Sequence, residues 1–429
     1  MDKLILVTGA TGYIASRLIP RLLDSGYRVR CLARNPRRLQ ARSWFNQIDI
    51  IQADVTTPAT LAHAFDGVDT AYYLIHNMAA GHGYTRIELD GARNFASAAA
   101  QASAAHIIYL GGLADPEQHI APHMRSRIET GKVLRQGKTP VTEFRAGVIT
   151  GSGSISFEMI RFMTELFPIV PGPAWMRNKS QPIAIQNVID YLCAALENKN
   201  GQGQVFEIGG PEITTYQDLM LRYARARRYK RDMLIFPYVP LWFMAFGVGL
   251  MTPVSYPIAY ALIGGLSTDS IVSHPEALKV FPEVKLIGFD AATKDALAKT
   301  HPAYIERVWD NGEQKTQSFK HEGCFMDHRE TRINASPEKV FCAIMQIIEE
   351  YDWQIEMQAA NSRILICAED HAFGDQWIEW RVDQTRLTQT IFFSPRGLPG
   401  FLYWILLAPF QRMKFRGLIG EITKLSKNQ

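Results

Sequence analysis

A loop of small residues near the start of the chain has the spacing of a phosphate-binding turn. Gly9, Gly12 and Ala15 lie in GATGYIA, between the apolar run KLILV and an amphipathic helical pattern that ends at Gly26. Gly9 permits a tight turn, Gly12 lets the backbone approach a pyrophosphate, and Ala15 lets the helix pack close to the strand. Free N–H groups at the helix N-terminus would then bind the anion, with help from the helix dipole. The alternative is a strand-to-helix turn without a ligand.

The charge that follows the second predicted strand selects between the two common dinucleotides. The strand RVRCLAR ends in Arg34, where NAD-binding chains usually carry an acid that holds the ribose 2′-hydroxyl. Arg37 and Arg38 follow, and no acid does. An arginine at this position suits the 2′-phosphate of NADP. We therefore expect NADP rather than NAD, bound by Arg34 and Arg37, with Arg38 on the solvated surface.

The segments that follow these arginines continue the alternation of strands and helices. IDIIQADVTTPATLAHAF indicates a strand, Asp54 and a helix, and VDTAYYLIH and AHIIYLGGL indicate two further strands. This order predicts an α/β fold, a doubly wound parallel sheet of the Rossmann type. Asp54 is expected to face the adenine. The residues predicted to bind the dinucleotide are Gly9, Thr11, Gly12, Tyr13, Ile14, Arg34, Arg37, Asp54, Val55 and Leu74.

A series of motifs in this order resembles the short-chain dehydrogenase/reductases. The motifs are VTGATGYIA, the turn at Arg34, ADVTT, AYYLIH, IIYLGGL and FRAGVITGSG, followed by QPIAIQNVIDYLCAAL and QVFEIGGPEITTYQDLM. The resemblance is strongest to the extended and atypical, NmrA-like members, and it extends over most of the chain before the C-terminal part. It implies the Rossmann fold and dinucleotide binding, and it says much less about the reaction.

The catalytic pattern of that family is altered in this chain. Active members carry Ser or Thr after the fifth strand and Tyr-x-x-x-Lys on the next helix, where the Tyr exchanges a proton with the substrate. Here Gly111 and Gly112 occupy the serine region, and His123 and Arg127 fall at the Tyr and Lys positions. In one interpretation His123 is the proton donor, tuned by Arg127, because histidine works as an acid and base near neutral pH. In the other, the catalytic centre is lost and the domain only binds the nucleotide.

Three side chains near the fourth predicted strand are alternative proton donors. Tyr73, His76 and His82 lie close to the expected position of the nicotinamide, and each is equally consistent with a packing role. We predict no metal site, because the sequence has no H-E-x-x-H motif and no cluster with metal-ligand spacing. The five scattered cysteines include no C-x-x-C pair, which argues against zinc and favours a reducing cytoplasm.

A long uncharged stretch follows a basic cluster in the middle of the chain. Residues 222–232 read RYARARRYKRD, and residues 233–268 then carry no charge. Prolines interrupt the stretch, so it falls short of the roughly 20 apolar residues of a membrane span. We favour a pair of buried helices that close an apolar pocket or pack on the last domain. The alternative is a helix that lies in a membrane surface beside the basic cluster.

The last part of the chain predicts a second, smaller α+β domain. We place a linker at residues 300–325 and the domain at residues 326–429, where a strand, a helix starting at Ser336-Pro337, alternating strands and a long helix follow one another. This is the order of a helix-grip fold. ETRINASPEKVF resembles the opening of START-like and polyketide-cyclase-like domains, and the tail resembles a domain of unknown function in bacterial short-chain-dehydrogenase-like proteins. Six aromatic residues there line a cavity or, as we favour, pack the core: Trp377, Trp380, Phe392, Phe393, Tyr403 and Trp404.

Composition and charge set the class of protein. The chain has 429 residues, 47% of them hydrophobic and 21% charged, with a net charge of +4. These values indicate a soluble globular protein of more than one domain, and the small net charge argues against a nucleic-acid partner. We assign residues 1–300 to the dinucleotide-binding domain, which includes the apolar helical segment 233–268.

Together these observations favour a cytoplasmic NADP(H)-binding oxidoreductase. Hydride would pass between NADPH and an apolar carbonyl, imine or activated double bond, with His123 or Tyr73 as the acid. The alternative from a different functional class is a non-catalytic NADP(H)-binding sensor or assembly factor. Such a protein could also contact a membrane surface. NmrA-like proteins and the short-chain-like accessory subunit of respiratory complex I are the precedents. An epimerase or dehydratase of nucleotide sugars is the weakest alternative, because the apolar segment does not suit a sugar.

Overall fold

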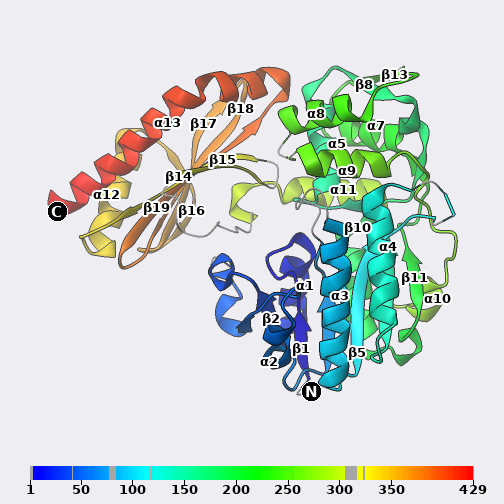
Figure 1. Ribbon diagram of the computed structural model, residues 1–429. Helices are drawn as coiled ribbons and strands as arrows, with labels where there is room; N and C mark the ends of the chain where they lie inside the picture. Colours follow the sequence, from blue (N-terminus) through cyan, green and yellow to red (C-terminus); the bar gives the residue numbers. More distant parts are fainter. Residues whose placement is uncertain are drawn as a thin grey trace.

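The chain folds into a larger and a smaller part, each built on its own sheet (Figure 1). The computed structural model describes residues 3–40, 42–76, 84–115, 117–118, 120–252, 254, 256–304, 316–321 and 324–428. His82 and residues 305–315 of the expected linker lie outside the described residues. The larger part begins at the N-terminus, and the smaller part ends in the long C-terminal helix.

A seven-stranded parallel sheet is the centre of the larger part. Its strands are β1 (Leu4–Val7), β2 (Arg28–Ala33), β3 (Asp49–Gln52), β4 (Thr70–Tyr73), β5 (His106–Gly112), β6 (Val141–Ala146) and β11 (Val205–Ile208). They lie in the order β11-β6-β5-β4-β1-β2-β3, and every hydrogen-bonded pair is parallel. The strand order reverses at β1, which places a ligand crevice at the carboxyl ends of β1 and its neighbours. The predicted Rossmann-type sheet is confirmed.

Helices cover both faces of this sheet because its central strands are buried on both sides. β1, β4 and β5 have no exposed residue, as expected for parallel strands between two helical layers. α1 (Tyr13–Asp24) and α6 (Ile185–Glu197) pack on one face, and α2 (Leu61–Ala64), α3 (Tyr84–Gln101) and α4 (Pro122–Arg135) on the other. Short 3₁₀ turns join these elements: η1 (Pro36–Leu39), η2 (Phe45–Gln47), η3 (Pro58–Thr60) and η6 (Lys199–Gly201).

The segments between and after the last strands form a second layer next to the sheet. Its helices are α5 (Ile155–Leu166), α7 (Tyr216–Ala226), α8 (Leu241–Met251), α9 (Tyr256–Gly265), α10 (Ala277–Val280) and α11 (Phe289–Ala298), with η5 (Ala174–Arg177) and η7 (Pro302–Tyr304). Three two-stranded sheets connect them: β7 (Ile149–Thr150) with β10 (Ile183–Ala184), β9 (Lys179–Ser180) with β12 (Thr214–Thr215), and β8 (Ile169–Pro173) with β13 (Asp232–Phe236). This layer supplies one wall of the pocket described below.

The uncharged stretch at residues 233–268 forms β13 and the helix pair α8–α9. The two helices pack against each other through Ala245, Val248, Ala259 and Ile263, which are buried. Their outer sides are exposed, so the prediction of a buried pair is correct only for the inner side. The reason is that no described element covers the outer side. Among the described residues, no helix combines the length and the apolar character needed to cross a bilayer.

The smaller part is a six-stranded antiparallel sheet with two helices. Its strands are β14 (Thr316–His321), β15 (Cys324–Arg332), β16 (Gln354–Ala359), β17 (Arg363–His371), β18 (Gly374–Val382) and β19 (Arg386–Pro395), in the order β14-β15-β19-β18-β17-β16. α12 (Pro337–Glu350) and the 32-residue α13 (Gly397–Asn428) pack together over it. Alternating side chains such as Ile364, Ile366 and Ile378 meet the helices in one core, as period-2 strands predict. A second, smaller domain is therefore present.

The smaller sheet packs on α5 of the larger part. The guanidinium of Arg161 on α5 is buried, lies 3.2 Å from Glu158 Oε2, and donates a hydrogen bond of 3.0 Å to Ser394 Oγ at the end of β19. The rings of Phe162 on α5 and Phe325 on β15 meet edge to face, with centroids 6.3 Å apart. A buried charge of this kind is costly unless it is paired. The contact is thus specific and fixes where the second sheet lies.

Candidate functional site

A cleft of about 750 Å³ opens at the carboxyl ends of β1 to β4. The loops that follow these four strands line it, which is the expected ligand position in a doubly wound sheet. The structure brings together seven of the residues predicted to bind the dinucleotide. They are Gly9, Thr11, Gly12, Arg34, Asp54, Val55 and Leu74.

The glycine turn after β1 has the geometry of a phosphate cradle. Gly9 has a φ of +67°, and a Cβ added there would lie 2.7 Å from the carbonyl oxygen of Leu74. Gly12 donates to the Gly9 carbonyl at 2.7 Å and is the N-cap of α1, where no side chain caps the helix. The first N–H groups of α1 are therefore left to a ligand, and their partial positive charge favours an anion.

The arginines after β2 are arranged differently from the prediction. Arg34 lines the cleft as expected, and so does Arg38, which the sequence had assigned to solvent. The Nε of Arg38 is buried and forms no hydrogen bond among the described residues. Arg37 is exposed and lines neither this cleft nor its neighbour. The turn of η1 is the cause, because it places successive side chains on different sides.

A second pocket, of about 230 Å³, adjoins the cleft. Tyr13 and Ile14, predicted to contact the dinucleotide, line this pocket instead of the cleft, because the first turn of α1 points them across the ends of β5 and β6. Most of the remaining wall is apolar and comes from distant segments. It includes Leu110, Leu113, Met124, Val148, Ile149, Leu262 and Leu266. His76 lines both cavities, so it stands where a cofactor and a substrate would meet.

His76 is held by a buried carboxylate. Its Nδ1 lies 2.7 Å from Glu88 Oε1, and the hydroxyl of Ser126 donates to the other oxygen of Glu88. Glu88 is on α3, Ser126 is on α4, and both are buried. Burial, followed by the charge of Arg127, lowers the pKa of His76, although Glu88 opposes the shift. The Nε2 atom is buried without a hydrogen bond among the described residues, and it is therefore the ring nitrogen left for a reacting group.

His123 lies in the wall of the second pocket. Burial, followed by the charges of His76 and Arg127, lowers the pKa of His123 to about 4. Its ring packs against α9, where a Cβ on Gly265 would lie 2.8 Å from the ring Cε1. The Nδ1 atom is buried and forms no hydrogen bond among the described residues. His123 is thus a neutral ring at pH 7, and it contacts the pocket but not the cleft.

The other two residues predicted to be catalytic have largely structural surroundings. Arg127 donates from Nη2 to the Leu110 carbonyl at 2.7 Å, so its cation supports the end of β5 while lining the pocket. The prediction that Tyr73 is a proton donor has to be corrected, because Tyr73 is buried between Phe95 and Tyr109 and lines neither cavity. Its position on β4 points it to the helix layer, and burial raises its pKa. It cannot reach a substrate in this fold.

Glu88 is the residue that the sequence analysis missed. It belongs to the inner stripe of α3, in register with the buried Ala92, Phe95 and Ala99. A carboxylate at helical spacing within an apolar stripe is a signal, because an acid is seldom buried without a partner. Its partner His76 could not be identified from spacing. No group of three or more potential metal ligands occurs among the described residues.

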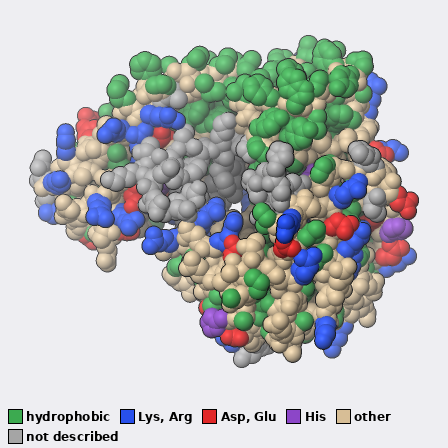
Figure 2. Space-filling model, in the orientation of Figure 1, with side chains coloured by type: hydrophobic (Ala, Val, Ile, Leu, Met, Phe, Trp, Pro, Cys, Tyr) green, Lys and Arg blue, Asp and Glu red, His purple; other side chains and the backbone are tan. Residues whose placement is uncertain are grey.

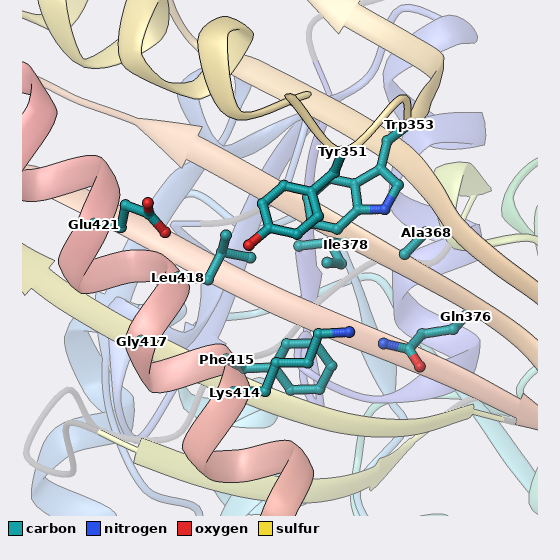
Figure 3. A pocket seen from close by; sticks show the side chains of 10 residues that line it. All are labelled: Tyr351, Trp353, Ala368, Gln376, Ile378, Lys414, Phe415, Gly417, Leu418 and Glu421. Carbon is teal, nitrogen blue, oxygen red and sulfur yellow. The ribbon is translucent and has the colours of Figure 1, made fainter. Parts of the chain in front are cut away.

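The smaller domain has a separate cavity of about 220 Å³ between its sheet and α13 (Figure 3). The rings of Tyr351 and Trp353 stack there with centroids 4.7 Å apart, and Lys414 and Glu421 approach from α13. None of the six aromatic residues proposed for a cavity lines it. Four of them, Trp380, Phe392, Phe393 and Trp404, are buried core residues, as the favoured packing interpretation expected.

Comparison with known proteins identifies the family that the cleft-containing domain resembles. Residues 1–200 match the model of the NmrA-like family. The N-terminal domain is NmrA-like. A (4-alkanoyl-5-oxo-2,5-dihydrofuran-3-yl)methyl phosphate reductase of Streptomyces griseus subsp. griseus is 29% identical over 229 residues, 52% of this chain and 73% of that protein. The photosystem II assembly factor Ycf39 of Cyanophora paradoxa is 26% identical over 226 residues, 50% of this chain and 66% of that protein.

Solved structures share the fold of the NmrA-like domain and extend it beyond residue 200. A Citrobacter sp. triphenylmethane reductase in complex with NADP(H) has a TM-score of 0.55 at 19% identity, covering 68% of this chain and 99% of that one. An NADPH-dependent quinone oxidoreductase of Escherichia coli has a TM-score of 0.53 at 18% identity, covering 67% and 98%. The family binds NAD(P), and both of these structures belong to NADP(H)-using proteins, in agreement with the predicted cofactor class.

Proposed function

We propose that this protein is an NADP(H)-dependent reductase that acts on an apolar carbonyl or enone. The observation that carries the proposal is the contact between the two cavities: a dinucleotide cleft and a largely apolar pocket meet at His76. Such a junction is where a reductase must place the nicotinamide and the bond to be reduced. The names of the similar proteins, which include several reductases, support the same class of reaction.

The residues of the cleft fit NADP(H). The Gly9 turn leaves room for a pyrophosphate at the N-terminus of α1. Arg34 and Arg38 supply two cations for the 2′-phosphate, and the buried Nε of Arg38 lacks a hydrogen-bond partner that a phosphate oxygen would provide. Asp54, at the end of β3, is the residue that would face the adenine. When bound, the nicotinamide supplies the hydride.

The protein itself would supply the proton. Glu88 holds Nδ1 of His76 and leaves Nε2 for a reacting group, which fixes the ring and partly offsets the lowering of its pKa by burial and Arg127. His123 and Arg127 stand in the adjoining wall, where His123 is a second candidate acid. Burial, together with the nearby charge of Arg127, lowers the pKa values of both histidines. In reduction, a proton would pass from His76 Nε2 to the substrate oxygen or α-carbon.

A non-catalytic role remains the alternative function. Gly111 and Gly112 replace the family's Ser or Thr, and His123 and Arg127 replace its Tyr and Lys. One similar protein is named an assembly factor, which supports a nucleotide-binding role without turnover. An epimerase or dehydratase of nucleotide sugars fits less well, because the pocket wall is mostly apolar.

For the C-terminal domain we propose a helix-grip, START-like fold. A strand, a helix, antiparallel strands and a long final helix follow one another, and α13 lies across the sheet over the cavity in Figure 3. We propose that the domain begins at or before β14 (Thr316–His321), earlier than the predicted start at residue 326, because β14 pairs with β15 in the sheet of this domain. Its cavity is smaller than most ligand sites, and it lies apart from the junction at His76.

The decisive experiment measures binding and turnover separately. NADPH and NADH affinities are obtained by fluorescence titration, and turnover is followed with NADPH deuterated at C4 and a panel of apolar quinones, enones and aldehydes. The proposal expects NADPH to bind more tightly than NADH and deuterium to appear in a product. Tight binding with no transfer across the panel would favour the non-catalytic role. No nucleotide affinity would show that the Gly9 loop is only a turn.

A further inference from the structure

The outer side of α8 is apolar although it faces solvent. Trp242 and Phe246, one turn apart, are 60% and 57% exposed, and Phe243 and Leu250 are exposed beside them. Ala245 and Val248 on the opposite side are buried. A surface helix normally carries polar residues on its outer side, and a helix that is apolar all round is normally covered by protein or lipid. Among the described residues, nothing therefore covers the outer side of α8.

Aromatic residues continue this surface around α8. Tyr238, in the turn before α8, is 81% exposed, and Phe236 at the end of β13 is exposed as well. Tyr256 and Tyr260 lie one turn apart on the outer side of α9, with ring centroids 6.0 Å apart. Tyrosine and tryptophan are enriched where an apolar phase meets water, because each combines an apolar ring with a polar group.

The first half of α13 has the same character in the other domain. Its inner residues, such as Phe401 and Phe415, pack on the sheet. Its outer residues recur at helical spacing and are exposed: Leu402, Ile405, Leu406, Phe410 and Met413. Phe410 is 67% exposed. No charged residue occurs between positions 397 and 411.

The two apolar regions lie on the same side of the molecule. In Figure 2 the hydrophobic side chains gather along one edge, over β13 and α8 of the larger part and over the smaller part. Met251, the last residue of α8, packs against the core of the smaller domain, and α13 contacts α5. We call this combined surface the apolar face: the exposed residues of β13, α8, α9 and the first half of α13. Contiguous exposed patches of this extent mark interaction sites.

Basic residues adjoin both halves of the apolar face. The stretch 225–232, which leads into β13 and ends at its first residue, contains five basic residues and one acid. Arg396 precedes α13, and Arg412, Lys414 and Arg416 follow its apolar half without an intervening acid. Some of these charges have partners, such as Arg396 with Asp375. Positive charges nevertheless predominate in both stretches, and they would attract an anionic surface.

We propose that the apolar face binds the surface of an anionic lipid bilayer. Trp and Tyr side chains would enter the interface, the apolar residues of α8 and α13 would enter the upper acyl region, and the basic residues would meet lipid phosphates. A second copy of the chain fits less well. A symmetric dimer would place the same basic segments opposite each other, and like charges would repel. A bilayer can contact the apolar residues of both domains at once, because its surface is flat and anionic and its interior is apolar.

Docking would place one wall of the pocket at the membrane. Tyr256 and Tyr260 lie on the outer side of α9, whereas Leu262 in its last turn and Leu266 just beyond its end line the pocket. An apolar substrate would then reach the pocket from the lipid phase. This consequence rests on the proposed reductase function, whereas the docking itself does not.

Flotation with lipid vesicles tests the proposal. The full chain is mixed with phosphatidylcholine vesicles, with or without about 30% phosphatidylglycerol, at low salt and at about 0.5 M NaCl. We expect flotation with the anionic vesicles at low salt and weaker flotation at high salt. The double variants Trp242→Glu/Phe246→Glu and Leu406→Glu/Phe410→Glu should each lower partitioning by about tenfold or more, because each places charge in the interface. Leu278→Glu, at a 42% exposed leucine of α10 at the far end of the larger part, is the matched control.

Two further readouts separate the other outcomes. NADPH titration and circular dichroism of each variant verify the fold and the cleft, so a failed reductase proposal leaves the flotation result intact. The docking proposal is overturned if the wild-type chain stays with the unbound fraction, or if the variants float like the wild type. It is also overturned if light scattering shows a wild-type dimer that the variants dissociate and no vesicle binding, since a second copy would then cover the face.

Discussion

The dinucleotide cleft and the apolar pocket share His76 but are assembled in different ways. The cleft is lined mainly by four short loops, each directly after a strand of the parallel sheet. The pocket draws on α1, β5, α4, β6, α5, α7 and α9, and its lining residues extend from Tyr13 to Ser270. The cleft therefore follows from local motifs, and the pocket follows from how remote helices pack.

This difference explains where the family pattern is kept and where it is lost. The cleft retains the glycine turn, the arginines and the acid of a dinucleotide site. The resemblance places His123 and Arg127 of the pocket at the positions of the usual Tyr and Lys. The pocket also contains His76, from the loop after β4, which is held by Glu88 on α3.

The largest effect is expected at the junction of the two cavities. His76→Gln should lower kcat by about 100-fold or more, the usual contribution of a positioned acid, while the NADPH affinity stays nearly unchanged. Glu88→Gln should lower kcat less and shift the pH profile of kcat, because the ring would lose the carboxylate that stabilises its charge. Stopped-flow and steady-state kinetics give both quantities.

The corresponding change at His123 sharpens this comparison. His123 lines only the pocket, so His123→Gln should cost less in kcat than His76→Gln. His63→Gln, at an exposed histidine on α2, is the control and should leave both parameters unchanged. If His123→Gln stops turnover and His76→Gln does not, the proton donor is His123.

A change at the glycine turn should affect the cleft alone. Gly9→Ala places a Cβ 2.7 Å from the Leu74 carbonyl at a φ of +67°, so we expect at least a tenfold loss of NADPH affinity and some loss of stability. Gly26→Ala is the matched control: its φ is +81°, but no atom lies within 4 Å of the added Cβ. Equal affinities in the two variants would remove the turn from the binding site.

Cofactor preference should depend on two arginines and not on the third. Arg34→Ala and Arg38→Ala should each reduce the preference for NADPH over NADH by about tenfold, the scale of one charge-assisted contact. Arg37→Ala should leave the preference unchanged, because Arg37 is outside the cleft. Titration with both dinucleotides measures the ratio. A shift with Arg34→Ala and Arg37→Ala but not with Arg38→Ala would restore the assignment made from the sequence.

The smallest effect concerns stability in acid. The folded chain holds the pKa of His123 at about 4 against 6.5 when unfolded, so the unfolded state binds more protons between these values. Stability is therefore complete above pH 6.5 and falls as the pH drops toward 4, by about 2 kcal/mol at pH 5 for this group. Urea denaturation at pH 7 and pH 5 should show a smaller acid loss for His123→Gln than for His63→Gln. Equal losses would mean that His123 is solvated.

The sequence by itself determined the sheet and most of the cleft. Buried strands, the glycine turn and the acid at the end of β3 are local patterns, and the parallel sheet brings their loops together at one edge. It also predicted a second, smaller domain with the order of strands and helices that is observed from β15 onward, but it placed β14 in the linker. The sequence assigned Arg37 to the cofactor and Arg38 to solvent, whereas Arg38 lines the cleft and Arg37 does not. A single 3₁₀ turn decides which of the two side chains faces inward.

Only the tertiary structure decided the chemistry of the junction and the exposure of the apolar segments. His76, Glu88 and Ser126 come from three separate elements, and their spacing in the sequence carries no sign of contact. The uncharged segments of α8 and α13 predict helices, but they do not show which sides are covered. Burial depends on what packs against a helix, and in this fold the neighbouring elements cover only one side of each.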